Sequence, residues 1–176
     1  LAAVENLADF HRLMRAVVLR LGGVLNQAGL ARDVGIAPTT AQRYLSLLET
    51  SHQLVRLEAF TVNRTKRLTK SPKMYWSDTG LALHLSGESE PRGAHLENLV
   101  LHDLPVWAET QPSRPRILYW RTTKGAEVDF VIEWRGRVVP VEVKSGMRVR
   151  SNDVRSLRVF LDEYADLAQS GLVLYN

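Results

Sequence analysis

Two runs of alternating apolar and polar residues, EVDFVIEW and RVVPVEVK, stand on either side of an Arg-Gly dipeptide at positions 135–136. A period of two predicts β-strands, and the glycine between them permits the backbone reversal of a hairpin. If the loop is symmetric about that dipeptide, Trp134 faces Arg137 and Asp129 faces Glu142. The pattern therefore predicts a hairpin that brings two carboxylates together.

The same alternation predicts that one face of the hairpin is apolar and the other is charged. On the charged face Glu127 lies across from Lys144. The apolar face carries Val128, Phe130, Ile132, Val139, Val141 and Val143.

The facing acids suggest a metal site. Carboxylates directly opposite each other on a sheet have β-carbons about 5 Å apart and repel each other. A hard divalent cation bound between Asp129 and Glu142 reverses that cost, and Lys144 lies two residues beyond Glu142. The alternative is a solvated polar face with a weak ion pair between Glu127 and Lys144.

The elements around the hairpin predict a mixed sheet. A helix over residues 94–108 precedes a strand at Arg116–Arg121, and Ser151 caps a second helix after the hairpin. The segment Gly171–Tyr175 reads as a last strand that returns parallel by a right-handed crossover. The predicted order is αβββαβ. Glu97 falls on the apolar stripe of the first helix, where a carboxylate needs a partner.

The first half of the chain reads as a winged helix-turn-helix. After an amphipathic helix, a short helix at Gln27–Val34 meets a turn at Gly35, and Pro38 opens a second helix. Two strands at residues 54–60 and 73–76, joined by a basic loop, complete the wing. The polar stretch GESEPRG then marks a boundary, which gives predicted domains at residues 1–87 and 88–176.

Two groups of side chains in the first domain are candidates for nucleic-acid binding. The second helix buries Ala41, Tyr44, Leu45 and Leu48, which leaves Thr39, Thr40, Gln42 and Arg43 outside. The basic loop adds Arg64, Lys66, Arg67, Lys70 and Lys73. A structural or protein-docking role for this domain is the alternative.

The composition narrows the function classes. A net charge of +4 and a pI near 9.6 favour acidic partners such as DNA. The absence of cysteine excludes disulfides and thiolate zinc sites and fits the cytoplasm, and no apolar run approaches the roughly 18 residues of a membrane span. The sequence contains no glycine-rich phosphate loop that ends in Gly-Lys-Ser/Thr. We therefore expect no ATP site of that kind in this chain. We also expect a fragment of a longer protein, because the chain begins with Leu1.

The histidines do not follow a metal-ligand spacing. We interpret them as surface or packing residues. They are His11, His52, His84, His95 and His102.

The order of Glu97, Asp129 and Glu142-Val143-Lys144 resembles the PD-(D/E)XK nuclease fold of restriction endonucleases and Holliday junction resolvases. The stretches GAHLENLV, LYWRTTKGAEVDFVIEWRG and VVPVEVKSG, behind a winged helix, resemble the C-terminal half of the DUF4143 group of prokaryotic AAA+ family ATPases. The resemblance implies a restriction-endonuclease-like α/β domain. It also implies that an N-terminal ATPase domain precedes the winged helix in the whole protein.

The nuclease resemblance also implies roles. Asp129 and Glu142 hold Mg²⁺ or Mn²⁺, Glu97 assists, and Lys144 steadies the attacking water or the phosphate. The expected function is a DNA-binding, Mg²⁺-dependent endonuclease module. A catalytically inactive module that docks nucleic acid or protein and regulates the ATPase domain is the alternative, with homo-oligomer contacts as one way to do so.

Overall fold

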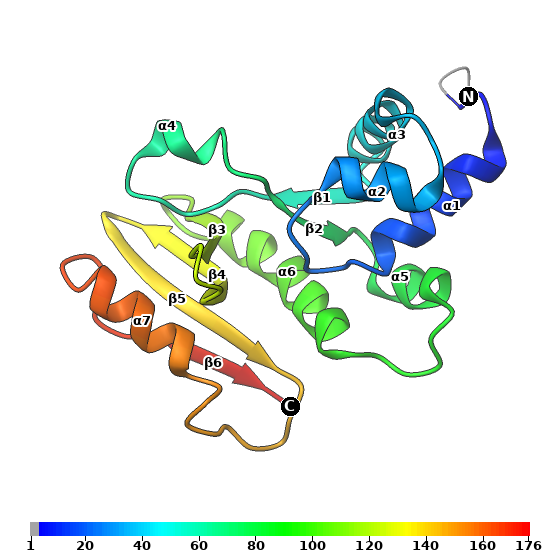
Figure 1. The fold of residues 1–176 in the computed structure, drawn as a ribbon. Helices are drawn as coiled ribbons and strands as arrows, with labels where there is room; N and C mark the ends of the chain where they lie inside the picture. Colours follow the sequence, from blue (N-terminus) through cyan, green and yellow to red (C-terminus); the bar gives the residue numbers. More distant parts are fainter. Residues whose placement is uncertain (1–3) are drawn as a thin grey trace. The chain divides into compact units, whose positions relative to one another are not determined.

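The structure is a computed structural model that describes residues 4–176 and divides into two compact units (Figure 1). Unit 1 holds the residues up to Arg56 together with Ser71–Asn98, and unit 2 holds Leu57–Lys70 together with Leu99–Asn176. The chain thus passes between the units three times. A single linear cut at 87/88 does not describe this division, because Leu57–Lys70 belongs to unit 2 and the last cut falls inside a helix.

Unit 1 contains the predicted helices and a two-stranded sheet. Asn6, Asn26 and Asp78 cap helices by accepting backbone N–H bonds, and Gly35 ends one with a left-handed φ of 76°. The elements are α1 (Leu7–Val18), α2 (Gln27–Val34), α3 (Pro38–Thr50), β1 (Leu54–Leu57), β2 (Lys73–Trp76), α5 (Thr79–Ser86) and the start of α6 (Gly93–Glu109).

The stripe predicted for α3 forms the centre of the unit 1 core. All four of its residues are buried, namely Ala41, Tyr44, Leu45 and Leu48. They pack with the inner faces of α1 and α2 and with Met74 and Trp76 of β2.

The segment between β1 and β2 departs from the predicted wing. It leaves unit 1, forms the short helix α4 (Arg64–Arg67) and packs with unit 2. Phe60 donates its backbone N–H to Tyr119 and joins the unit 2 core. The Arg67 guanidinium makes a bidentate contact with Glu133, at 2.7 and 2.8 Å. The segment therefore differs from the predicted wing, two strands joined by a basic loop, because its first strand ends at Leu57 and it contains the helix α4.

The Arg67–Glu133 pair gives unit 2 an acid-sensitive contact. Hydrogen bonds from Arg67 outweigh burial and hold the pKa of Glu133 below its ordinary value of 4.5. A depressed carboxyl pKa adds stability that is present above about 4.5 and is lost as pH falls through the folded-state pKa.

We therefore expect the stability of unit 2 to fall in acid more steeply in the wild type than in Glu133→Gln. The variant is less stable at neutral pH, because it leaves the Arg67 charge buried. Hydrogen exchange of the β4 amides as a function of pH measures both effects. Equal acid slopes in the two proteins contradict the assignment.

Unit 2 is built on the predicted four-stranded mixed sheet. Strands β3 (Arg116–Arg121), β4 (Glu127–Trp134) and β5 (Arg137–Lys144) are antiparallel neighbours, and β6 (Leu172–Tyr175) runs parallel to β5. Helix α7 (Arg155–Glu163) lies across β4 and β5 (Figure 1). The order αβββαβ is confirmed. The predicted Ser151 cap was wrong, because α7 begins after Val154, which makes no side-chain cap bond.

The predicted hairpin register is confirmed from Trp134 opposite Arg137 to Phe130 opposite Val141. The prediction that Val128 shares a face with Phe130 and Ile132 was wrong. Two β4 residues, Asp129 and Phe130, stand opposite the single β3 residue Tyr119, which defines a β-bulge. The extra residue shifts the alternation.

Because of this shift, Val128 joins Val131 in the core against α7, although the two are three residues apart. Apolar packing therefore occupies the face that alternation had assigned to charge.

In the described residues 4–176, no helix combines the length and the apolar character needed to cross a membrane.

Candidate active site

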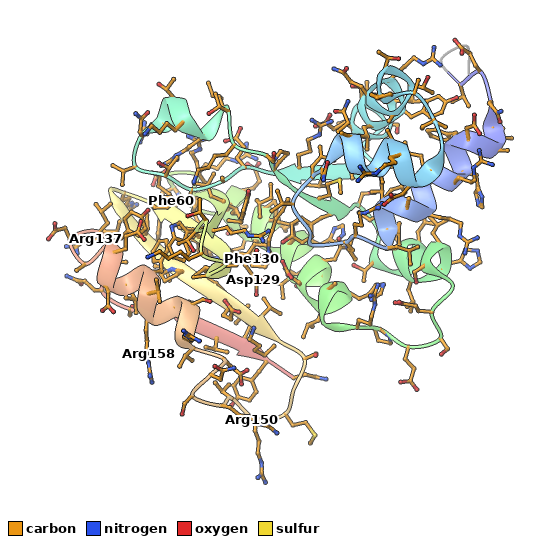
Figure 2. All side chains as sticks on the ribbon, viewed as in Figure 1. Phe60, Asp129, Phe130, Arg137, Arg150 and Arg158 are labelled. Atoms are coloured by element: carbon orange, nitrogen blue, oxygen red, sulfur yellow. The ribbon has the colours of Figure 1, made fainter. Side chains whose placement is uncertain are left out.

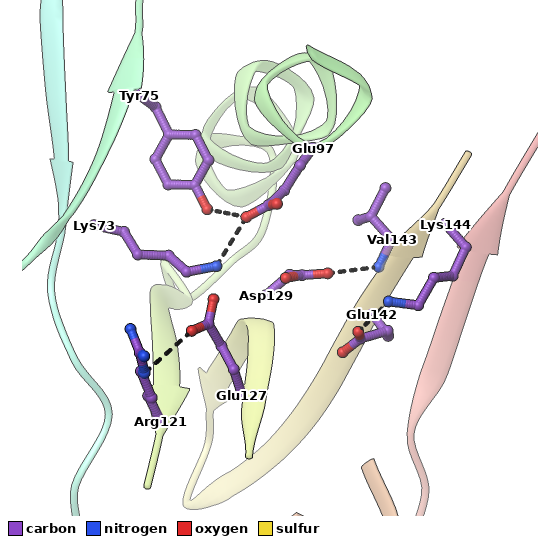
Figure 3. Close-up of polar contacts among 9 residues, drawn as sticks. All are labelled: Lys73, Tyr75, Glu97, Arg121, Glu127, Asp129, Glu142, Val143 and Lys144. Carbon is purple, nitrogen blue, oxygen red and sulfur yellow. Dashed lines mark hydrogen bonds and ion pairs between the residues drawn. The ribbon is translucent and has the colours of Figure 1, made fainter. Parts of the chain in front are cut away.

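The bulge in β4 sets the position of Asp129. Its Oδ2 atom accepts the backbone N–H of Val143 at 2.9 Å, so a side chain takes a donor of β5 (Figure 3). The paired register ends at Phe130 opposite Val141, and Asp129 and Glu142 are the next residues of β4 and β5 beyond that last pair. Bulges commonly re-aim a side chain next to a functional site, and here the re-aimed side chain is an acid that is only 9% exposed.

Glu142 is the second buried acid and is 6% exposed. Its Oε1 atom accepts a hydrogen bond from Lys144 Nζ at 2.5 Å. Glu127 contacts Arg121 instead, at 3.5 Å. The alternative of a solvated polar face was therefore wrong, because both facing acids are buried and Lys144 pairs with Glu142.

Lys144 remains a cation in this site. Burial by itself lowers the pKa of Lys144, but its hydrogen bond to Glu142 and the charges of Glu142, Asp129 and Asp153 raise the pKa above the ordinary value. At neutral pH the site therefore holds a protonated ammonium beside the carboxylates. This arrangement can bind an anion without first taking up a proton.

The donor set fits a hard divalent cation that keeps most of its waters. Mg²⁺ is usually held by one or two carboxylates, with water and substrate phosphate as the other ligands. Asp129 and Glu142 supply two such carboxylates on adjacent strands. In the described residues 4–176, no group of three or more His, Cys, Asp and Glu side chains is arranged to hold a metal ion. The fit is therefore to a two-carboxylate site.

Glu97 belongs to unit 1. Its carboxylate lies on the apolar stripe of α6 and has the polar partners that such a position requires. Its Oε1 atom lies 2.9 Å from Lys73 Nζ and also accepts a hydrogen bond from the Tyr75 hydroxyl (Figure 3). Lys73 is 1% exposed. Lys73 is thus a buried counter-ion of Glu97, and its predicted place among exposed nucleic-acid contacts does not hold.

The other candidate nucleic-acid residues divide by exposure. Thr39 and Gln42 of α3 are exposed and Thr40 is half-buried. Arg43 Nη1 pairs with Glu5 Oε1 at 2.5 Å. In unit 2, Arg67 is buried against Glu133, whereas its basic neighbours in the segment are exposed. Those neighbours are Arg64, Lys66 and Lys70.

Sequence reasoning missed one neighbour of Lys144 and one partner of Glu97. Asp153 acts on the charge of Lys144 and stands nine residues after it, where it reads only as part of a helix start. The Tyr75 hydroxyl donates to Glu97, but in the sequence Tyr75 reads only as a core aromatic of a short strand. Neither position carries a local signal of its role.

Two family models together match the whole length of the chain. Residues 1–92 match the model described as Domain of unknown function (DUF8612), and residues 92–176 match Domain of unknown function (DUF4143). The junction at residue 92 is close to the start of α6. The resemblance of the second half to DUF4143 is therefore confirmed.

Uncharacterized proteins of Mycobacterium bovis and Mycobacterium tuberculosis are each 37% identical to this chain over 131 residues, which is 70% of the chain. The match covers 29% of the length of these curated relatives. No solved structure matches the chain. Through its first 92 residues the chain belongs to the DUF8612 family, and its second half matches the DUF4143 model.

Proposed function

We propose that unit 2 hydrolyses phosphodiester bonds of DNA with Mg²⁺ or Mn²⁺, and that unit 1 binds DNA through α3. One observation carries the proposal. Asp129 and Glu142 are buried on adjacent strands, one at a bulge, beside a lysine that stays protonated. A fold that only needed packing would place apolar side chains there, because buried acids are costly.

In this proposal Asp129 and Glu142 hold the cation, which when bound polarises the phosphate and acidifies a water molecule. The Val143 N–H keeps the Asp129 carboxylate in one orientation. The Lys144 ammonium binds a phosphate oxygen and stabilises the negative charge that builds up during reaction. Glu97 is engaged with Lys73 and Tyr75, so we assign it to the stability of unit 1.

DNA binding by unit 1 is supported by the exposed residues at the start of α3, Thr39 and Gln42. Short polar side chains at this position of a helix-turn-helix suit contacts with base edges and phosphates. Arg43 joins them if DNA displaces Glu5, which is an exposed partner. A preceding ATPase domain in the whole protein remains a prediction.

A binding module without catalysis is the second candidate. It is favoured by the short contact of Lys144 with Glu142, which engages an acid that the metal requires. It is also favoured by the small number of metal ligands, because the described residues offer two carboxylates and no group of three or more ligating side chains. This candidate predicts binding to DNA or protein that survives chelation of metal and the change Glu142→Gln.

The test is cleavage of plasmid, linear and branched DNA by the 176-residue chain with Mg²⁺ or Mn²⁺. We expect products with either metal and none after EDTA is added, because the carboxylates alone cannot activate water at the phosphate. If no DNA is cut with either metal while binding persists in EDTA, the second candidate replaces the first.

A further inference from the structure

Two hollows on unit 2 are lined in part by the segment that leads into α7. The first, of about 740 Å³, lies between the β3–β4 turn and α7 and includes Asn152 in its lining. The second, of about 560 Å³, lies at the loop after β5 and includes Asp153. Because Asn152 and Asp153 are consecutive, the two hollows are neighbours.

The first hollow is rich in hydrogen-bond donors. Lys124 and Arg155 are its cations and Glu163 is its acid, and hydroxyls of both threonines of the turn and of Ser156 also line it. The turn is held in shape, since Ala126 N–H donates to Thr122 Oγ1 at 3.0 Å. The α7 side chains in this lining come from the helix face that the core residues Leu157 and Phe160 leave free.

The second hollow contains the lysine of the candidate active site. Lys144 lines it together with Arg148 and Arg150, and Asp153 is its acid. The Asp153 carboxylate accepts the backbone N–H of Arg150 at 2.7 Å, which folds the loop back toward α7. Figure 2 shows the Arg150 side chain projecting outward from unit 2.

We infer that the two hollows form one basic track for the sugar-phosphate backbone of a DNA strand. The second hollow takes the reacting phosphate at Lys144, and the first takes another phosphate of the same strand. This inference rests on the proposed function and extends it to the substrate: an extended strand is bound, and a single nucleotide fills only part of the track.

The chemistry of the lining favours the backbone over the bases. Cations outnumber acids by two to one in the first hollow and three to one in the second. Among the described residues that line them, none is aromatic, so the track lacks the ring surfaces on which unpaired bases stack. Lysine, arginine and hydroxyl groups are the usual partners of phosphate oxygens. We therefore expect binding with little sequence preference.

The experiment measures binding of labelled single-stranded and duplex DNA to the 176-residue chain by fluorescence anisotropy, in EDTA, at several salt concentrations. One variant, Lys124→Gln with Arg155→Gln, changes the first hollow. The other, Arg148→Gln with Arg150→Gln, changes the second. The control is Arg158→Gln, an exposed arginine of α7 that lines neither hollow and projects outward in Figure 2.

We expect each double variant to bind duplex about tenfold more weakly and to lose about 2 from the slope of log K against log salt, one per phosphate contact. Arg158→Gln keeps the wild-type slope. The inference is overturned if the double variants, folded by circular dichroism, bind like Arg158→Gln. It is also overturned if each removed positive charge lowers DNA affinity by the same factor in the double variants and in Arg158→Gln. Absence of DNA binding by the wild type overturns it as well.

Binding in EDTA separates this inference from the proposed hydrolysis. If both double variants lose DNA binding but the wild type never cuts DNA, the track is supported and the proposed hydrolysis is rejected. If the wild type cuts DNA and both double variants bind DNA normally, the track is rejected and the proposed hydrolysis is supported.

Discussion

Glu142→Gln is expected to reduce metal-dependent DNA cleavage by on the order of 10³-fold. The amide removes one of the two anionic ligands, a carboxylate that is only 6% exposed, and leaves Asp129 as a single, weaker ligand for the cation. It also removes the acceptor of the Lys144 ammonium. Lys144→Met is expected to lose less, about 10²-fold, because the cation still polarises the phosphate.

Glu127→Gln is the matched control for this prediction. It makes the same chemical change on β4, two residues before Asp129, at a carboxylate that contacts Arg121. Its cleavage rate should stay within about threefold of wild type, since Glu127 is not a ligand in this account and its ion pair with Arg121 is partly open to solvent. Cleavage rates measured over a range of Mn²⁺ concentrations provide the comparison. Equal rates for Glu142→Gln and Glu127→Gln would remove the assignment of Glu142.

Glu97→Ala is expected to destabilise unit 1 by about 3 kcal/mol, the scale of breaking a buried ion pair from one side. The change leaves the Lys73 ammonium buried and removes the acceptor of the Tyr75 hydroxyl. The double variant Lys73→Met with Glu97→Leu should recover most of the loss, because an apolar pair of similar size no longer buries a charge.

Urea unfolding followed by hydrogen exchange of the α1 and α3 amides measures this effect within unit 1. The control is Glu49→Ala, which removes a partly exposed partner of Arg56 and should cost about 0.5 kcal/mol. If Glu97→Ala is as stable as Glu49→Ala but inactive in cleavage, Glu97 acts in the reaction and not in the fold of unit 1.

Local signals sufficed for most of the elements. The helix at Gln27–Val34 and the strands at Lys73–Trp76 and Arg116–Arg121 have the predicted bounds, because a cap and a turn glycine mark the helix and short apolar runs between charged residues mark the strands. The hairpin register followed from the symmetry of a two-residue loop.

The errors arose where residues far apart in sequence decide the structure. The stretch after β1 reads as a basic wing, but Phe60 and Arg67 find their partners in unit 2, on Tyr119 and Glu133. The bulge at Asp129 appears only in the pairing of β4 with β3, where two β4 residues stand opposite one β3 residue. The burial of Lys73 depends on Glu97, 24 residues later.

The candidate site was therefore predictable in its acids but not in its surroundings. Asp129 and Glu142 followed from register alone. The bond from Val143 N–H to Asp129 and the contact of Lys144 with Glu142 depend on the bulge and on burial, which strand alternation does not report. The same holds for the hollows beside α7, whose lining comes from two loops and a helix.

The most direct test of the account is a crystal structure of the chain soaked in Mn²⁺, with data collected for anomalous scattering. We predict an anomalous peak within coordination distance, about 2.2 Å, of oxygens of both Asp129 and Glu142, and no such peak in Asp129→Asn. A wild-type crystal at saturating Mn²⁺ that shows no peak at these two carboxylates contradicts the account.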